Sequence, residues 1–262
     1  MSARRFALAS GTLVARELTR FFRQRNRVIG AFATPLLFWL FLGSGLGRNF
    51  QAPAGTVGEG LTYLQFFLPG TMALVCLFTA IFSTISVIED RQAGFLQAVL
   101  VSPAPRGSIV MGKMVGGTLL ALLQAIVFMA LLPAVGIFPS FAGLAWALFL
   151  LVLLSFGLTG LGVVIAWTTD SIQGFHAVMN LLLMPMWFLS GAVFPVESAP
   201  GWLKILMLAN PVTYGVAGLH LAFFGANRGG GPSLSVCVGG ILLFAVSMFV
   251  GSWLLVRRTR GG

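Results

Sequence analysis

The chain has 262 residues, of which 58% are hydrophobic and only 8% are charged, with a formal net charge of +10 at pH 7. Ordinary soluble domains carry roughly 25% charged residues, so this composition excludes a soluble globular protein. The basic residues lie beside long apolar segments, where anionic lipid headgroups are the expected counter-charge and nucleic acid is not. The sequence therefore predicts a membrane protein.

Residues 1–27 contain seven arginines and no apolar core, which argues against a cleaved signal peptide. Within this segment, residues 15–27 have the spacing of an amphipathic helix with Phe21 and Phe22 on its apolar face. We predict a cytoplasmic interface helix, with its apolar face in lipid and its arginines toward phosphate groups. Its expected contact residues are Arg16, Arg20, Phe21, Phe22, Arg23 and Arg27.

Residues 28–262 are predicted to form one membrane domain with six transmembrane helices. A helix needs about 20 mostly apolar residues to cross roughly 30 Å of hydrocarbon. The segments that meet this requirement are residues 28–46, 61–88, 109–133, 143–167, 173–194 and 234–256. None of them alternates as barrel strands do, so we expect an all-α protein.

The basic residues predict the orientation of these spans. Seven of them precede the first span, three lie between residues 91 and 113, and three follow the last span, against Arg48, Lys204 and Arg228 on the other side. Because basic residues concentrate on the cytoplasmic side, we expect both termini in the cytoplasm of a multi-pass protein of the inner (plasma) membrane.

The region between residues 88 and 107 interrupts two spans with charge. The span 61–88 would be about 42 Å long, so Glu89, Asp90 and Arg91 should emerge into water. After Gly94 a short apolar helix is predicted, which prolines end. From these residues alone, this helix could either seal the edge of the bilayer or dock on a partner.

The next segment, Gly107 to Met114, nearly matches a phosphate-binding loop, but Met114 replaces the hydroxyl that would hold Mg²⁺. We interpret it as a chance match and expect Lys113 to extend toward lipid headgroups. Glycines in the third and fourth spans could pack helices within one chain or between two copies: Gly112, Gly116, Gly157, Gly160 and Gly162.

A further apolar segment, residues 195–225, is cut by Asn210 and Pro211 into pieces of about 10 and 13 residues. Each piece is too short to cross a bilayer, so we predict a re-entrant or interfacial helical hairpin on the extracellular side, between spans five and six. Its marker residues are Pro200, Trp202, Asn210, Pro211 and Tyr214.

The residues offer no catalytic or metal site. Neither histidine has a partner at the spacing of a metal ligand or a catalytic neighbour. The six acidic residues lie at span ends or in loops, which disfavours a secondary transporter or channel without an ATPase, although that alternative stays open.

Two stretches carry a resemblance to a known family. The segments IEDRQAGFLQAVLVSPAPRGSIVMGK and MWFLSGAVFPVESAPGWLKILMLANPVTYGVAGL resemble the cytosolic loop and the later signature of ABC-2 type transport permeases. These permeases are the membrane subunits of ATP-binding-cassette exporters. The resemblance is greatest to the daunorubicin-resistance type of drug exporter permease, and it extends along the whole chain.

The resemblance implies a coupling helix from about Glu89 to Ser102 that docks on a separate ATPase, and an interface helix that also approaches that ATPase. On this basis the coupling residues are Glu89, Asp90, Arg91, Gly94, Phe95, Leu96, Val99, Leu100, Pro103 and Arg106. The hypothesis is that the three charged residues contact the ATPase and the apolar side chains fill its cleft.

The resemblance also implies two permease copies with two ATPase subunits that hold the ATP and Mg²⁺, so this chain is not an enzyme by itself and has no cofactor of its own. The expected substrate is an amphipathic drug, antibiotic or lipid, and a polysaccharide or lipo-oligosaccharide is the alternative within the family. The 24 Phe against 2 Tyr and 6 Trp favour an apolar path.

Overall fold

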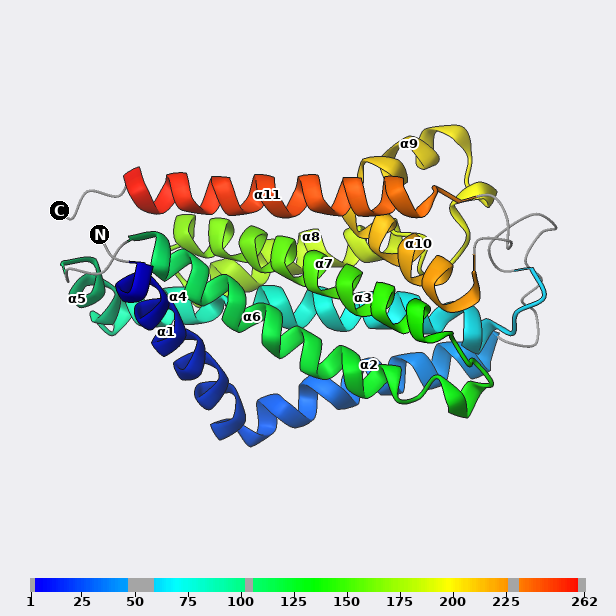
Figure 1. The fold of residues 1–262 in the computed structure, drawn as a ribbon, viewed down its shortest axis with the longest axis horizontal. Coiled ribbons are helices and arrows are strands. Elements are labelled where there is room, and N and C mark those ends of the chain that lie inside the picture. The colour runs from blue at the N-terminus through cyan, green and yellow to red at the C-terminus, as the bar shows by residue number, and fades with distance from the viewer. Residues whose placement is uncertain (1–2, 47–58, 102–105, 226–230, 259–262) are drawn as a thin grey trace.

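The computed structural model describes residues 3–46, 59–101, 106–225 and 231–258, and this part of the chain is helical, without strands (Figure 1). Two turns of 3-10 helix, η1 (Pro133–Val135) and η2 (Val196–Ser198), interrupt the α-helices. The α-helices are α1 (Ala3–Arg23), α2 (Arg25–Leu46), α3 (Tyr63–Ser83), α4 (Ile85–Gln92), α5 (Phe95–Val101), α6 (Arg106–Met129), α7 (Phe141–Thr168), α8 (Ile172–Phe188), α9 (Gly201–Ala209), α10 (Pro211–Phe224) and α11 (Leu234–Arg258).

Five helical segments are long and apolar enough to cross a membrane, or six if α9 and α10 are one broken span. The five are α2, α3 with α4, α6 with the turn after it, α7 and α11. The fifth predicted span, residues 173–194, corresponds to α8, which ends earlier, at Phe188, and has 17 residues. Pro185 lies in its last turn, and the chain then turns at Gly191, whose φ is +80°. The protein is therefore membrane-integral, with five or six helices able to span.

The second predicted span, residues 61–88, is a run of 30 residues, Tyr63–Gln92, made of α3 and α4. Thr84 separates α3 from α4, and its N–H and hydroxyl both donate to the Ile81 carbonyl. A hydroxyl that bonds back to its own helix competes with the regular hydrogen-bond ladder. At about 1.5 Å per residue the run is about 45 Å long, which exceeds a hydrocarbon core of roughly 30 Å. The prediction that Glu89, Asp90 and Arg91 all emerge into water is wrong for Asp90, which is buried within the protein.

Small residues let the central helices approach closely. Gly157 and Gly160 of α7 face Ala245 and Met248 of α11, and Gly162 lies against Thr84. Gly112 and Gly116 of α6 lie instead against Leu13 and Glu17 of α1. Both groups of glycines therefore pack helices of the same chain against each other, which is the first of the two roles that the sequence left open for them.

The break between α9 and α10 is confirmed, with a bend of 89° at Asn210. The Asn210 side chain accepts from the Val212 N–H and donates to the Met186 carbonyl, and the Tyr214 hydroxyl donates to the Leu208 carbonyl. Pro200 precedes α9 and Trp202 is exposed, whereas α10 buries Val212, Val216 and Leu219. The first half of the hairpin thus lies at the surface and the second half packs in the bundle.

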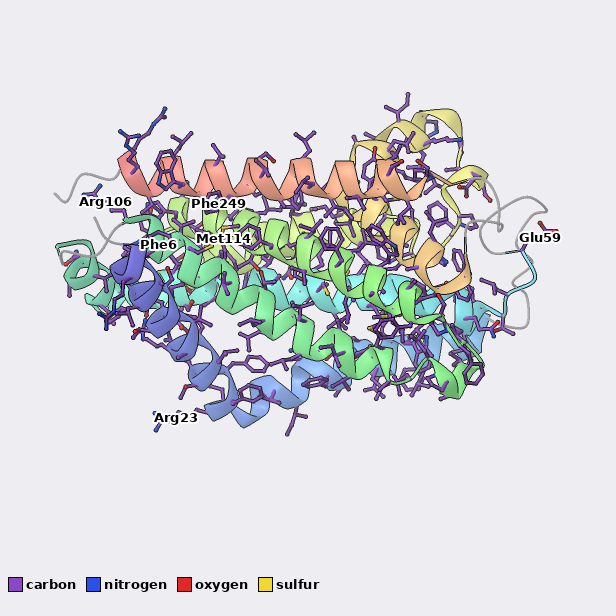
Figure 2. All side chains as sticks on the ribbon, viewed as in Figure 1. Phe6, Arg23, Glu59, Arg106, Met114 and Phe249 are labelled. Carbon is purple, nitrogen blue, oxygen red and sulfur yellow. The ribbon has the colours of Figure 1, made fainter. Side chains whose placement is uncertain are left out.

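One end of the bundle gathers the start of α1, the end of α11 and the corner formed by α4 and α5 (Figure 1). The helices α9 and α10 lie toward the opposite end (Figure 1). The N-terminal helix is longer than predicted, because it runs from Ala3 to Arg23 and α2 begins directly after Gln24. Arg23 projects away from the bundle where α1 meets α2 (Figure 2).

Candidate functional site

Six charged side chains from three helices meet in what we call the charge cluster. Its members are Arg16, Glu17 and Arg20 of α1, Glu89 and Asp90 of α4, and Lys113 of α6. Lys113 Nζ lies 2.5 Å from Glu17 Oε1, 2.7 Å from Asp90 Oδ2 and 2.9 Å from Ser86 Oγ. The three cations and three carboxylates balance, so the cluster is neutral in formal charge.

Asp90 is the centre of the charge cluster. Arg16 donates to its carboxylate through both terminal nitrogens, at 2.9 and 2.5 Å, and Arg20 adds a contact of 3.3 Å. Arg20 also lies 2.6 Å from Glu89. The hydrogen bond to Asp90 is the largest cause that raises the pKa of Arg16 above its ordinary value. Both arginines are therefore held toward the protein.

The burial of these groups makes their pairing obligatory. Asp90 is 2% exposed, and Glu17 and Lys113 are each 5% exposed. A buried charge that loses its partner destabilises a protein far more than a surface pair stabilises it. The cluster therefore fixes α1 and α6 against the end of α4.

Two sequence predictions are corrected here. Lys113 does not extend to headgroups, because two carboxylates and a hydroxyl satisfy its ammonium group inside the chain. Arg16 and Arg20 do not face away from the protein toward lipid phosphate, because they bind Asp90. Of the other predicted interface residues, Phe21 is buried, Phe22 and Arg23 are exposed, and the Arg27 side chain lies outside the described part.

The predicted helix from about Glu89 to Ser102 is two helices. Glu89, Asp90 and Arg91 form the last turn of α4, the chain turns at Gly94 with a φ of +72°, and α5 follows. A positive φ favours glycine, and here it lets α5 leave the direction of α4.

The apolar side of α5 faces its own chain. Leu96 is 5% exposed and packs with Leu13 of α1 and Ile109 of α6, and Phe95 and Val99 pack against the same group. The Arg16 guanidinium lies 3.8 Å from the centroid of the Phe95 ring, a cation–π contact. In this arrangement Leu96 thus contacts its own chain, and the hypothesis that the apolar side chains of this helix fill a partner's cleft stays a prediction. The described exposed residues of the corner are Gln92, Ala93, Gly94, Gln97 and Ala98.

Arg91 binds on the other side of α4. Its guanidinium donates to the carbonyls of Ala166, Trp167 and Thr169 at 3.0, 2.8 and 3.1 Å. These carbonyls belong to the end of α7, where helix carbonyls have no partner within the helix and a cation is favourable. Asp170 adds a contact of 3.7 Å. Arg91 therefore ties α4 to the turn between α7 and α8.

The remaining predicted coupling residues lie nearby or outside the described part. Arg106 begins α6 and donates to the Arg257 carbonyl at 3.1 Å, which ties α6 to the end of α11 (Figure 2). Pro103 falls in residues 102–105 and the Leu100 side chain is likewise outside the described part.

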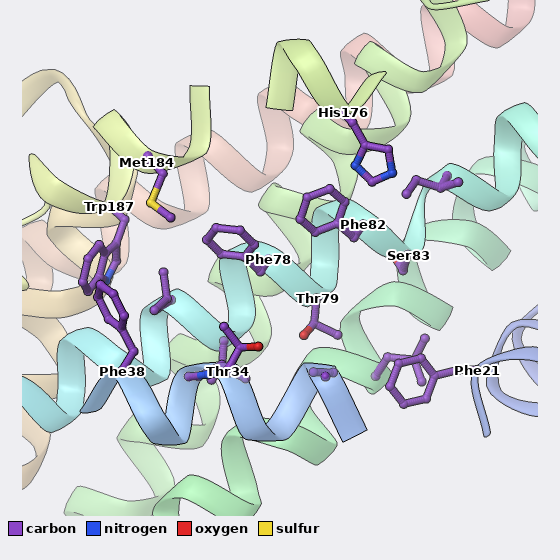
Figure 3. A pocket seen from close by; sticks show the side chains of 17 residues that line it. Phe21, Thr34, Phe38, Phe78, Thr79, Phe82, Ser83, His176, Met184 and Trp187 are labelled. Carbon is purple, nitrogen blue, oxygen red and sulfur yellow. The ribbon is translucent and has the colours of Figure 1, made fainter. Parts of the chain in front are cut away.

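A cavity of about 520 Å³ opens among α2, α3 and α8, with α1 and α6 closing its sides (Figure 3). Trp187 and Phe38 lie at one end of it and Phe21 at the other (Figure 3). Aromatic and aliphatic side chains make most of its wall, and the polar side chains in it are Thr34, Thr79, Ser83 and His176. The cavity suits an apolar body with few polar groups.

The cavity and the charge cluster are neighbours on one helical run. Ser83, at the end of α3, lines the cavity, and Ser86, in the first turn of α4, accepts a hydrogen bond from Lys113 of the cluster. The Thr84 break lies between them. Ile85, the first residue of α4, also lines the cavity, so α4 forms part of the cavity wall.

Sequence reasoning missed Glu17, Ser86 and Lys113 as members of a site, and it missed the cavity. The charge cluster could have been found from the rarity of charged residues. Glu17 and Lys113 stand beside apolar stretches in a chain with only six acidic residues, and a charge in such a place is expected to have a partner. For the cavity, the signal is Phe78 and Phe82, one helical turn apart in the second span.

Comparison with known proteins places these features in a family. The family model described as ABC-2 type transporter matches residues 9–224, which include both the charge cluster and the cavity. A putative transport permease ycf38 of Cyanophora paradoxa is 31% identical over 214 residues, which make up 80% of this chain and 72% of the relative.

Two further relatives differ in the length of the region that they share with this chain. Nodulation protein J of Rhizobium leguminosarum bv. trifolii is 29% identical over 235 residues, 88% of this chain and 86% of the relative. The probable multidrug ABC transporter permease YbhR of Escherichia coli K12 is 32% identical over 172 residues, 64% of this chain and 44% of the relative.

Proposed function

The chain belongs to the ABC-2 type transporter family, and on this premise we propose that it is the export permease on which a separate ATPase subunit acts at the α4–α5 corner. Permeases of this family normally pair with an ABC ATPase subunit. The proposed assembly has two permease copies and two ATPase subunits, with ATP and Mg²⁺ bound on the ATPase. The charge cluster is the observation that carries this proposal.

The charge cluster supports a mechanical role for the corner. Asp90 joins α4 to α1 and α6, Arg91 joins α4 to α7, and Arg16 rests on Phe95 of α5. Four helices, α1, α4, α6 and α7, are thus joined through Asp90 and Arg91, and α5 is added through the contact of Arg16 with Phe95. A push on α5 moves these helices together rather than bending one loop.

The surface proposed for the ATPase contact is the exposed side of the corner, from Gln92 to Ala98. Its described exposed residues are small or uncharged, which lets a partner approach closely without having to desolvate a charge. The apolar residues of α5 hold the corner to its own chain. Glu89, Asp90 and Arg91 accordingly act by positioning the corner.

The proposed orientation has both termini on the cytoplasmic side of the inner membrane, with the ATPase. Supporting this, Arg257 and Arg258 lie in the last turn of α11, at the same end of the bundle as the α4–α5 corner (Figure 1). The α9–α10 hairpin then belongs to the extracellular side.

The proposed substrate is an amphipathic molecule such as a drug, an antibiotic or a lipid. The cavity supports this choice, since rings and aliphatic side chains make most of its wall. The relative named a multidrug permease points the same way. A glycan would need many more hydrogen-bonding groups than the four polar side chains of this cavity provide.

The test uses cysteine protection, because the native Cys76 and Cys237 are both buried. Ala98→Cys and the control Gly201→Cys, exposed on α9, would be labelled with a maleimide in membrane vesicles with and without a co-expressed ABC ATPase subunit that binds the permease. We expect the ATPase to protect position 98 and to leave position 201 reactive. Equal labelling at position 98 with and without a bound ATPase would refute the docking proposal.

A further inference from the structure

Gln124 of α6 is a buried amide with an unused hydrogen-bond donor. It is 1% exposed, and its Oε1 accepts a hydrogen bond from the Thr79 hydroxyl. Its Nε2 has no hydrogen-bond partner among the residues that the structure describes. An N–H left unpaired in a membrane protein interior is costly, and such groups call for an explanation.

Thr79 behaves differently from other threonines of these spans. Thr71, Thr118 and Thr159 each donate to the backbone carbonyl four residues earlier, which is the usual bond of a threonine inside a helix. The Thr79 hydroxyl is instead directed across to Gln124 on the neighbouring helix. Gln124 therefore holds this hydroxyl away from its own backbone.

Thr79 is one of the residues that line the cavity. Gln124 does not line the cavity and reaches it only through its hydrogen bond with Thr79. Figure 3 shows the Thr79 side chain on the same helix as Phe78 and Phe82, between the Trp187 end and the Phe21 end of the cavity. The residue is 13 positions before Gln92 in the run Tyr63–Gln92, so it lies deep in the span. A polar group at this depth meets mostly apolar wall.

The pair has hydrogen-bonding capacity that the protein does not use. While Thr79 donates to Gln124, its oxygen can still accept a hydrogen bond from a group in the cavity. If a ligand oxygen accepts from Thr79 instead, the Gln124 amide can turn and donate its N–H to Thr79, which satisfies the buried donor. A hydroxyl group both donates and accepts, so it suits either arrangement.

We propose that Thr79, positioned by Gln124, is the hydrogen-bonding point of this cavity, and that it selects amphipathic small molecules with a hydroxyl group on an aromatic or aliphatic body. The inference rests on the proposed function in one respect, that this cavity receives the substrate. The volume of about 520 Å³ falls in the usual range of small-molecule sites. Phe78 and Phe82 supply the surface against which the apolar body packs.

The experiment measures binding of 1-pyrenebutanol and of its methyl ether to the detergent-solubilised protein, by energy transfer from tryptophan to pyrene. Trp187 lines the cavity and serves as a donor. One net hydrogen bond corresponds to a preference of about threefold to tenfold for the alcohol in the wild type. We expect Thr79→Val to remove this preference while the ether binds as before.

Three further variants separate recognition from packing. Gln124→Leu leaves Thr79 in place but lets its hydroxyl return to its own backbone, so the preference for the alcohol should fall there too. Thr34→Val makes the same chemical change on another wall of the cavity and should keep the preference, as should Thr79→Ser. The proposal is overturned if the alcohol and the ether bind the wild type equally, or if Thr34→Val and Thr79→Val have the same effect.

The measurement contains neither ATP nor an ATPase. A failure here therefore leaves the cysteine-protection test of the proposed function untouched, and a failure of that test leaves this one untouched.

Discussion

Asp90 and Arg91 are neighbours in the sequence, but their side chains bind different helices. Asp90 pairs with Arg16 and Lys113, toward α1 and α6, and Arg91 donates to the carbonyls at the end of α7. Because both side chains leave the same turn of α4, neither helix group can shift without moving that turn. This turn is the point at which we expect substitutions to separate ATP hydrolysis from transport.

The first prediction concerns Asp90. Asp90→Asn leaves Arg16 and Lys113 without their common counter-charge, and removing one partner of a buried ion pair costs about 3–5 kcal/mol. We expect the free energy of unfolding in detergent micelles to fall by that order, measured by chemical denaturation followed by circular dichroism. The matched control is Asp170→Asn, whose carboxylate is fully exposed and should change stability little.

The second prediction concerns Arg91. Lysine keeps the positive charge but lacks the planar guanidinium whose nitrogens donate to three carbonyls of α7. Arg91→Lys should therefore loosen the contact between α4 and α7. We expect ATPase binding and basal hydrolysis to persist while transport per ATP hydrolysed falls severalfold in reconstituted vesicles. Arg258→Lys, exposed at the end of α11, is the control. Unchanged coupling in Arg91→Lys would show that the α4–α7 contact does not transmit movement.

The third prediction distinguishes the two sides of α5. Leu96→Asp places a charge among Leu13 and Ile109 and should destabilise the protein even without the ATPase. Ala98→Arg changes an exposed position and should leave unfolding unchanged but reduce co-purification of the ATPase. Ser198→Arg, exposed in η2, should affect neither measurement. If Ala98→Arg retains the ATPase fully, the docking surface lies elsewhere.

The fourth prediction concerns the contact between Gly162 and the α3–α4 break. A Cβ at Gly162 would lie 2.7 Å from Thr84 Oγ1 and 3.1 Å from the Ile81 Cα, so Gly162→Ala should cost about 1–3 kcal/mol of unfolding free energy. Gly239→Ala in α11, where a Cβ meets nothing within 4 Å, should be neutral or slightly stabilising. Thr84→Ala should restore part of the stability lost in Gly162→Ala. A lack of rescue would place the strain at the Ile81 backbone.

Local signals in the sequence predicted the helices and several of their ends. The Asn210–Pro211 break was visible, because proline restricts the backbone of its own position and of the residue before it. The turn at Gly94 was missed, because glycine permits a positive φ but does not require it. The end of α8 at Phe188 was missed, since the apolar sequence continues past it to residue 194. Composition reports which residues can lie in lipid, but not where the chain leaves the helix.

The inward orientation of Arg16 and Arg20 could not be predicted from periodicity. An amphipathic pattern identifies two faces of a helix, and on its own it assigns the charged face to water or headgroups. Here the partner Asp90 lies 74 residues beyond Arg16, and Lys113 lies 96 residues beyond Glu17. Only the tertiary fold brings these charges together.

The same separation dictates an order of assembly during synthesis. The N-terminal helix is made first, but Glu17 has no buried lysine to meet until residue 113 has left the ribosome and entered the membrane. Until then the helix keeps its charges in water, and its glycine-lined seat on α6 does not yet exist. The first helix to be translated is thus fixed in place only when the third span, α6, has entered the membrane, so a ribosome stalled before residue 113 should leave that helix open to protease.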